Sequence, residues 1–249
     1  MELPKTDSVP KLEGIPANFS LLVFGPSKVG KTTMIADWPK AIILECEPGG
    51  ADLVKCRKMD IDSLPHFRDA YKLLMLDTEY DTVVVDTLDR VATWVEDEIC
   101  TEMKIGSILE SPRGERNGAQ WGEYKSRILQ VIAAMEKLPK KIIFLAHTKR
   151  TETDGQGVVI NPRTINLYGS TAISTMALIQ NIGYMFAKET DGGKTKRYLS
   201  FAPGINVECG SRHPALADKI LEIPKGRGYE VFAACFEPTK TKSEVKEKK

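Results

Sequence analysis

One octapeptide near the N-terminus constrains the fold of this chain more than any other feature of the sequence. It reads Gly-Pro-Ser-Lys-Val-Gly-Lys-Thr over residues 25–32, which fits the spacing G-x-x-x-x-G-K-T. An apolar run, Leu21 to Phe24, precedes it, and a helical pattern follows from Lys31. A strand, a glycine-containing loop and a helix in this order form a phosphate-binding loop. We therefore expect an α/β fold with a nucleotide site at this loop.

The chemistry of such a loop gives its positions distinct roles. Backbone N–H groups surround the β-phosphate, Lys31 reaches the β- and γ-phosphate oxygens, and the Thr32 hydroxyl binds Mg²⁺. The predicted cofactors are therefore ATP and Mg²⁺. A chance match in a strand–turn–helix is the alternative, and the flanking patterns argue against it. The predicted nucleotide-binding residues are Gly25, Pro26, Ser27, Lys28, Val29, Gly30, Lys31, Thr32 and Thr33.

Short apolar runs alternate with amphipathic stretches from Ser20 to His147. Besides the strand before the loop, we predict strands at residues 41–44, 82–86 and 141–146 and helices at 64–76, 88–103 and 120–138. Strands separated by helices indicate a mostly parallel central sheet with helices on both faces.

The pattern changes after His147. Residues 148–169 are polar and show no periodicity, which is typical of a functional loop rather than a simple connection. Residues 183–187 and 197–201 are strand-like, and the turn signal between them predicts a C-terminal β-hairpin. A last helix is predicted at residues 214–221.

Length and composition indicate one sizeable domain rather than two. We predict a lead-in at residues 1–18, the domain at 19–236 and a disordered Lys-rich tail at 237–249. The formal net charge is +1, with 35 basic and 34 acidic residues. The tail holds five Lys and three Glu, which leaves 30 basic against 31 acidic residues in the rest. Any contact of the domain with nucleic acid must therefore come from a local patch.

The cysteines and the apolar runs bear on the compartment. The five cysteines contain no C-x-x-C pair, and no apolar leader precedes the domain. No apolar run reaches the ~18 residues of a membrane span. These features predict reduced thiols in a cytoplasmic protein that does not enter a membrane.

Three further positions are candidates for chemistry on the triphosphate. Asp86 ends an apolar strand, where a carboxylate holds the metal's water shell; a helix cap is the alternative. Glu45 and Glu47 follow the second strand, which we expect beside the strand of the loop or its neighbour. Either could be the general base, or both could be exposed turn residues. His147 ends the fourth strand and is a γ-phosphate sensor or a structural residue.

Together these motifs resemble the RecA-like P-loop ATPases, particularly the small phage-type RecA-fold proteins of single-strand annealing and recombination. The resemblance covers roughly residues 18–223. It implies Glu47 as the catalytic glutamate and His147 as the polar sensor, where many relatives carry Gln. With Lys31 of the loop, these are the predicted catalytic residues. It also implies a homo-oligomer, a ring or filament, in the cytoplasm of a bacterial host if phage-encoded. Hairpin residues Lys194, Lys196 and Arg197 would then reach the nucleotide of a neighbouring subunit.

The resemblance implies that the loop at residues 148–169 contacts single-stranded DNA. Its cations can neutralise phosphates, and its aromatic ring can stack on an unpaired base. A solvated loop with scattered charge is the alternative. Trp121 and Tyr124 are expected in the core or at a subunit interface rather than on DNA. The predicted nucleic-acid-binding residues are Lys149, Arg150, Arg163 and Tyr168, with Asn161 and Asn166 in the same loop.

The main hypothesis is an ATPase, stimulated by DNA, that binds single-stranded DNA in homologous recombination or strand annealing. A single-strand-binding protein is a further candidate partner. One rival is a non-catalytic DNA-binding assembly in which ATP is a structural ligand. The other is a P-loop kinase for a small metabolite, against which the long loop after His147 and the lack of an Arg-rich lid helix both argue.

Overall fold

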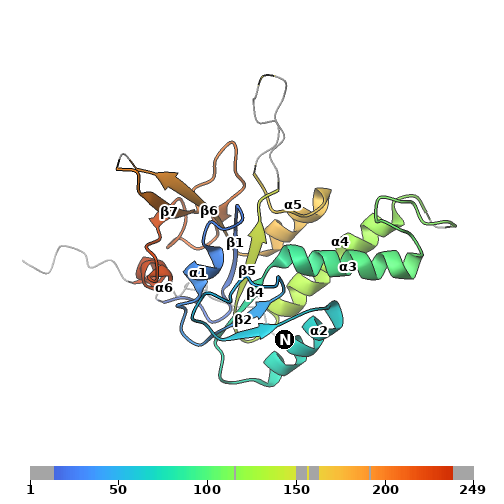
Figure 1. The fold of residues 1–249 in the computed structure, drawn as a ribbon, viewed down its shortest axis with the longest axis horizontal. Helices are drawn as coiled ribbons and strands as arrows, with labels where there is room; N and C mark the ends of the chain where they lie inside the picture. Colours follow the sequence, from blue (N-terminus) through green and yellow to red (C-terminus); the bar gives the residue numbers. More distant parts are fainter. Residues whose placement is uncertain (1–13, 115, 150–155, 157–162, 191, 238–249) are drawn as a thin grey trace, which may run out of the picture.

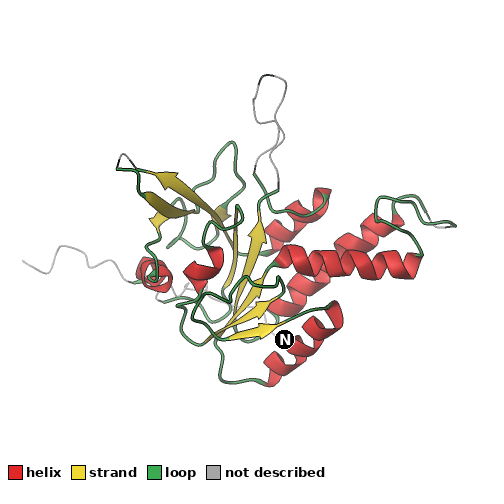
Figure 2. Cartoon of the chain, in the orientation of Figure 1, coloured by secondary structure: helices red, strands yellow, loops and turns green. Residues whose placement is uncertain are grey.

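The fold is built on one twisted sheet with helices on both faces (Figures 1 and 2). The computed structural model describes residues 14–114, 116–149, 156, 163–190 and 192–237. Over these residues the strands are β1 Ser20–Gly25, β2 Ala41–Glu45, β3 Lys58–Asp60, β4 Thr82–Asp86, β5 Lys141–His147, β6 Asn181–Glu189, β7 Thr195–Ser200, β8 Gly210–Ser211 and β9 Ile220–Glu222. The helices are α1 Lys31–Ile35, α2 Leu64–Leu76, α3 Leu88–Met103, α4 Ala119–Glu136, α5 Gly169–Leu178, α6 Gly228–Ala233 and the 3₁₀ turn η1 Ala234–Phe236.

The strand order is β3-β2-β4-β5-β1-β6-β7-β9, and β8 pairs with β6. The pairs from β3 to β6 are parallel, whereas β6, β7, β8 and β9 pair antiparallel. The predicted α/β class, with a mostly parallel sheet and a C-terminal hairpin, is confirmed. Because the parallel strands run in one direction, their carboxyl ends meet at one edge, where ligands bind in such sheets.

Both faces of the sheet are covered, which explains why the central strands are apolar throughout. In β1, Leu22 and Phe24 face the cluster that packs on α2, α3, α4 and α5, while Leu21 and Val23 face the cluster that packs on α1 and α6. Every residue of β1 and β4 is buried. The alternation of side chains therefore fills two cores from the same strands.

Local signals set the helix boundaries. The Ser63 hydroxyl accepts a hydrogen bond from the backbone N–H of His66 at 3.4 Å, and Pro65 occupies the first turn of α2. Both features are typical of a helix N-terminus. The predicted bounds of α2 and α3 agree with the structure, and so does the strand at residues 82–86.

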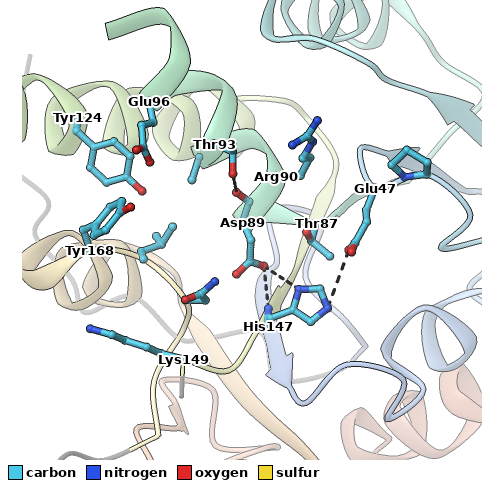
Figure 3. Close-up of a pocket in the computed structure, with 14 residues that line it drawn as sticks. Glu47, Thr87, Asp89, Arg90, Thr93, Glu96, Tyr124, His147, Lys149 and Tyr168 are labelled. Atoms are coloured by element: carbon cyan, nitrogen blue, oxygen red, sulfur yellow. Dashed lines mark hydrogen bonds and ion pairs between the residues drawn. The ribbon is translucent and has the colours of Figure 1, made fainter. Parts of the chain in front are cut away.

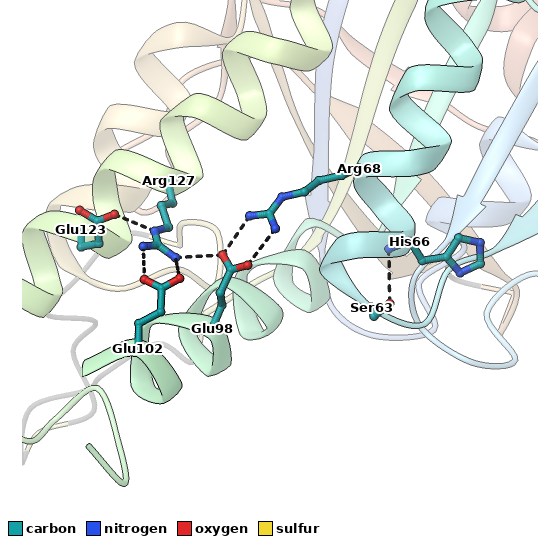
Figure 4. Close-up of polar contacts among 7 residues, drawn as sticks. All are labelled: Ser63, His66, Arg68, Glu98, Glu102, Glu123 and Arg127. Carbon is teal, nitrogen blue, oxygen red and sulfur yellow. Dashed lines mark hydrogen bonds and ion pairs between the residues drawn. The ribbon is translucent and has the colours of Figure 1, made fainter. Parts of the chain in front are cut away.

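Ion pairs connect three of the four helices that pack on the larger core, α2, α3 and α4. Arg127 of α4 contacts Glu98 and Glu102 of α3 and Glu123 of its own helix, and Glu98 also accepts from Arg68 of α2 (Figure 4). The Arg127 side chain is 21% exposed. An arginine shared among several carboxylates fixes helix orientation better than an isolated surface pair.

The predicted helix at residues 214–221 is wrong. Ile220–Glu222 forms β9 and pairs with β7, and the nearest helix is α6 at Gly228–Ala233. Asp218 has φ 60°, a left-handed turn that interrupts any helix there. The apolar residues at 216 and 220 have helical spacing, but Leu216 is buried while Ile220 is 58% exposed. The open edge of β7 determines this segment, since a strand there satisfies its backbone groups.

The predicted domain boundaries stay predictions. Residues 1–13 of the lead-in and 238–249 of the tail lie outside the described residues. Gly14 donates a backbone hydrogen bond to Phe236 at 3.1 Å, and Phe19 packs edge-on against Phe232 and Phe236 at 5.8 Å. Residues 14–19 thus join the C-terminal end of the domain.

Candidate nucleotide site

The phosphate-binding loop connects β1 to α1. Two of its residues have left-handed backbone angles, Lys28 with φ 62° and Gly30 with φ 106°. Gly25 is required for space, because a Cβ atom there would lie 2.2 Å from the backbone oxygen of Met185. The two glycines of the motif therefore provide the close approach to β6 and the turn into α1.

Lys31 is the buried cation of this loop, with 6% of its surface exposed. Its Nζ donates hydrogen bonds to the backbone oxygens of Gly25, at 3.1 Å, and Pro26, at 3.0 Å. Burial lowers the pKa of Lys31, and nearby carboxylates, Asp89 foremost, oppose this effect. The ammonium is thus held at the mouth of the loop by carbonyl groups, which a phosphate would replace as its partner.

Thr32 and Asp86 form the second feature of the site. The Thr32 hydroxyl donates to Asp86 Oδ2 at 2.7 Å. Burial raises the pKa of Asp86, and the hydrogen bond from Thr32 opposes that rise. A hydroxyl and a carboxylate are hard oxygen donors of the kind that Mg²⁺ uses together with water and nucleotide phosphates. Over the described residues no group of three or more His, Cys, Asp or Glu side chains could hold a metal ion. The oxygen atoms of Thr32 and Asp86 fit a Mg²⁺ whose other ligands are water and nucleotide phosphates.

The two glutamates at the end of β2 and just after it have different surroundings. Glu45 is 3% exposed, accepts a hydrogen bond from the Ala51 N–H at 2.6 Å and forms a close ion pair with Lys58. The Glu47 side chain is 50% exposed and lines the same cavity as Lys31 and Thr32. Both carboxylate oxygens of Glu45 are therefore already paired, one with Ala51 and one with Lys58. Glu47 is the carboxylate that faces the cavity.

The position of β2 corrects one expectation. We expected this strand beside β1 or its neighbour, but β4 and β5 lie between β2 and β1. The chain nevertheless reaches the site because it turns back after β2. The backbone N–H groups of Cys46 and Glu47 both donate to the Asp86 backbone oxygen, at 2.7 and 3.2 Å. This turn carries Glu47 over the end of β4.

His147 lies beside the start of the phosphate-binding loop, since β5 and β1 pair with His147 opposite Gly25. Its Nε2 is 4.0 Å from Glu47 Oε2, and its Nδ1 is 3.5 Å from Asp89 Oδ2 (Figure 3). The same oxygen of Asp89 accepts a hydrogen bond from the His147 backbone N–H at 2.8 Å. Asp89 is the main cause of a raised pKa of His147.

Sequence reasoning did not identify Asp89. It lies in the first turn of α3, where acidic residues are common because they interact favourably with the helix dipole. Its partner His147 is 58 residues further along the chain. No local signal separates this carboxylate from an ordinary helix-start residue.

Three adjoining cavities follow the edge of the sheet. The middle one, about 310 Å³, is lined by the loop together with Glu47, Asp86 and His147. The second, about 440 Å³, shares Glu47 and His147 with it and extends between α3, α4 and the segment after β5 (Figure 3). The third, about 230 Å³, shares Gly30 and Thr33 with the 310 Å³ cavity and continues past Met34 to Pro224.

The predicted DNA-binding residues do not form one group. Lys149 and Tyr168 line the 440 Å³ cavity, whereas Arg163 lies over the Tyr184 ring at 5.9 Å. Arg150 and Asn161 lie outside the described residues. The Tyr168 ring packs edge-on against Trp121 at 5.1 Å and Tyr124 at 5.5 Å. Of these two, Tyr124 is buried in the larger core and Trp121 packs against it, which confirms the core assignment.

The predicted intersubunit residues also have separate surroundings. Arg197 Nε donates to the backbone oxygen of Val29 at 2.9 Å, so its guanidinium supports the phosphate-binding loop of its own chain. Lys196 pairs with Glu222 at 2.9 Å, and Lys194 is exposed near the hairpin tip. Contact with a neighbouring subunit stays a prediction for all three.

The fold and the loop define a P-loop nucleotide-binding domain. The chain belongs to a family of AAA domains, whose characteristic sequence matches residues 17–213. Membership of this family implies an NTPase-type site, and the matched region contains the phosphate-binding loop together with Glu47, Asp86 and His147.

One relative is a prophage protein of Bacillus subtilis (strain 168), the SPbeta prophage-derived uncharacterized protein YorG. It is 24% identical to this chain over 132 residues, which are 51% of this chain and 40% of that protein. The match thus spans well under half of the relative's length.

No helix over the described residues is long and apolar enough to cross a membrane.

Proposed function

We propose that this protein binds ATP with Mg²⁺ and hydrolyses it, in a RecA-like manner, on single-stranded DNA. The observation that carries the proposal is the convergence of Glu47 and His147 on the cavity that Lys31, Thr32 and Asp86 also line. A cation for the phosphates, oxygen ligands for a metal and a carboxylate that faces the cavity and can accept a proton from water are the groups that hydrolysis needs.

The residues have separable roles in this scheme. Lys31 leaves the backbone oxygens of Gly25 and Pro26 to contact the β- and γ-phosphates. Thr32 and Asp86 would hold Mg²⁺, which supplies charge neutralisation on the phosphates when bound. Glu47 accepts a proton from the attacking water, and His147, 4.0 Å away, orients Glu47 and the terminal phosphate.

The cavities suggest how the nucleotide is oriented. With the γ-phosphate near Glu47 and Asp86, the α-phosphate lies near Thr33, and the nucleoside continues into the 230 Å³ cavity. That cavity has apolar walls from Met34, Met185 and Pro224, which suit the face of a base.

Single-stranded DNA is the proposed partner, with annealing or recombination as the proposed process. Lys149 and His147 both line the 440 Å³ cavity, and His147 also lines the phosphate cavity. A DNA strand bound beside Lys149 could therefore influence the proposed sensor directly. The prophage origin of the relative agrees with a phage-type protein. A homo-oligomer, a ring or filament, and a single-strand-binding protein as a further partner remain parts of this proposal.

One observation favours a second candidate, a kinase for a small metabolite. The 440 Å³ cavity meets the phosphate cavity at Glu47 and His147, where an acceptor hydroxyl would approach the γ-phosphate. A third candidate keeps ATP as a structural ligand without turnover. Release of free phosphate separates hydrolysis from both.

The test measures phosphate release by the full chain with ATP and Mg²⁺, alone and with equal masses of single-stranded or duplex DNA. We expect turnover that single-stranded DNA stimulates more than duplex DNA does, and none in Lys31→Ala. ATP-dependent thermal stabilisation without phosphate release, with or without DNA, would identify ATP as a structural ligand. Equal rates with both DNA forms would remove single-stranded DNA from the proposal.

A further inference from the structure

A row of aromatic side chains crosses one face of the antiparallel hairpin, on the far side of β1 from the Glu47–His147 pair. The Tyr184 and Phe186 rings of β6 are stacked, with centroids 5.8 Å apart and planes at 15°. Phe186 stacks in turn on Tyr198 of β7, at 5.4 Å and 24°. Phe186 and Tyr198 are partly exposed, whereas Tyr184 is buried. The row therefore leads from the core to the surface.

Tyr184 and Phe186 line a groove of about 730 Å³, which we call the hairpin groove, and Tyr198 continues the row beyond it by stacking on Phe186. One wall is the outer side of the phosphate-binding loop, including Ser27 and Lys28, and Arg163 forms part of another. Ser27 and Lys28 also line the phosphate cavity. One short loop thus separates a nucleotide from any ligand in the hairpin groove.

Cations continue the same face beyond the rings. Because side chains alternate along a strand, Lys188 lies on the face of Phe186, and Lys196 lies on the face of Tyr198. The register places Lys188 directly opposite Lys196. Like charges in this position destabilise a hairpin. Glu222 compensates Lys196, while Lys188 makes no ion pair with any described residue.

The charge at the inner end has the same sign. Lys28 is exposed, and Arg163, also exposed, lies with its guanidinium 5.9 Å from the centroid of the Tyr184 ring. The stability of the hairpin explains the stacked rings, because aromatic pairs across two strands stabilise a sheet. It does not explain the cations at both ends of the row, which add no such contact.

We propose that single-stranded nucleic acid binds along the hairpin groove and the hairpin face that continues it, with bases against Phe186 and Tyr198 and phosphates on Lys28, Arg163 and Lys188. Aromatic rings with flanking cations are how single strands are held without sequence readout, because every base has a stacking face. The inference rests on the proposed function, for which it names the surface. It also provides a route for nucleotide dependence through Ser27 and Lys28.

The occupant follows from the charge pattern. A second copy of this near-neutral chain would have to bury Lys188 and Lys196, which lie opposite each other, against a matching acidic patch. A polyanion supplies the neutralising charge at regular spacing, and its bases supply flat apolar surfaces. A protein partner is retained as an outcome of the test.

The test compares two oligonucleotides of equal length, oligo(dT) and an abasic strand that has the phosphates but no bases. Binding to the full chain is followed by fluorescence anisotropy over a salt series, with a non-hydrolysable ATP analogue. Tyr198→Leu removes the ring, Tyr198→Phe keeps it, and Lys188→Gln removes one charge. Matched controls on α2, at the opposite end of the sheet, are Tyr71→Leu and Lys72→Gln.

We expect Tyr198→Leu to weaken oligo(dT) binding by about tenfold while leaving the abasic strand unaffected. Tyr198→Phe should bind like the wild type. Lys188→Gln should weaken binding of both strands and flatten the slope of log affinity against log salt by ~0.7. The α2 variants should bind both strands as the wild type does.

Some results overturn the inference while the proposed function stands. This is the case if the wild type binds oligo(dT) and neither Tyr198→Leu nor Lys188→Gln changes that binding. A change of oligomeric state in Lys188→Gln without a change in DNA affinity would make the groove a protein interface. If the wild type binds no single strand at all, the proposed function fails first. Melting temperatures of all variants separate lost contacts from lost folding, and Lys188 is exposed, so its variant should fold normally.

Discussion

One carboxylate oxygen of Asp89 contacts His147 twice, through its backbone N–H at 2.8 Å and through Nδ1 at 3.5 Å. The first contact fixes the end of β5, and the second directs Nε2 toward Glu47 (Figure 3). The proposed base and sensor therefore depend on a residue that touches neither phosphate nor metal. Asp89 is a positioning residue in the proposed mechanism.

Asp89→Asn should lower kcat by roughly 10- to 100-fold, because a displaced catalytic group has effects of this size. The amide keeps an acceptor for the backbone N–H of His147 but loses the charge that orients the ring. The KM for ATP should stay nearly unchanged, since Lys31 and the loop backbone are intact. Steady-state phosphate release measures both quantities.

The matched control for this variant is Asp97→Asn, an exposed carboxylate on the same helix. It should behave as the wild type. In a His147→Gln background, Asp89→Asn should have little further effect, because both act through the same contact. Additive losses in the double variant would contradict the positioning role.

The raised pKa of His147 predicts a pH dependence of stability. A histidine whose pKa is higher in the folded than in the unfolded protein stabilises the fold when it is protonated. This contribution is fully present at pH values below the unfolded-state pKa of 6.5, and it is lost as the pH rises through the folded-state pKa. The difference in unfolding free energy between wild type and His147→Gln should therefore be largest at acid pH and decline above 6.5. Urea denaturation across this range measures it. A difference that grows with pH would contradict the assignment.

Glu47→Gln should leave ATP binding intact and lower hydrolysis by ~10²-fold or more, because the amide cannot accept the proton of water. Glu45→Gln is the matched comparison, two residues away with the same chemical change. Because Glu45 is buried and paired with Lys58, its variant should lower the melting temperature instead. ATP affinity, turnover and thermal melts of both variants provide the measurement. Loss of turnover in Glu45→Gln alone, with normal melting, would move the base to Glu45.

The sequence predicts the nucleotide loop and the larger helices well because their determinants are local. Ser63 and Pro65 define the start of α2 within a few residues of the apolar pattern that continues it. β3 was missed because two of its three residues, Lys58 and Asp60, are charged and exposed, and the segment forms a strand only by pairing with β2. β9 was missed for a similar reason, since its strand character depends on the edge of β7.

Parts of the candidate site depend on contacts that a single sequence does not reveal. Glu45 and Glu47 are equivalent in the sequence, and only the burial of one against Lys58 separates them. Asp89 acquires its role from the end of β5, and Arg197 acquires its contact from a loop 168 residues earlier in the chain. The contact between Arg197 and Val29 also has no signature in the sequence. The intersubunit role of the hairpin cations rests on the family resemblance and stays a prediction.

Arg197 and Lys194 now make different predictions about how the hairpin acts on the nucleotide. Arg197 Nε is 2.9 Å from the Val29 backbone oxygen, and its side chain packs against Gly30. Arg197→Gln should therefore weaken ATP binding at every protein concentration, because it loosens the loop of its own chain.

Lys194 is exposed, so Lys194→Gln should leave the ATP affinity of dilute protein unchanged. If Lys194 reaches a neighbouring subunit, its variant should lose only the part of the hydrolysis rate that grows with protein concentration. The measurement is ATP affinity in dilute protein together with specific activity over a 100-fold range of protein concentration. Loss of the concentration-dependent part in Arg197→Gln, with normal ATP affinity in dilute protein, would return Arg197 to an intersubunit role.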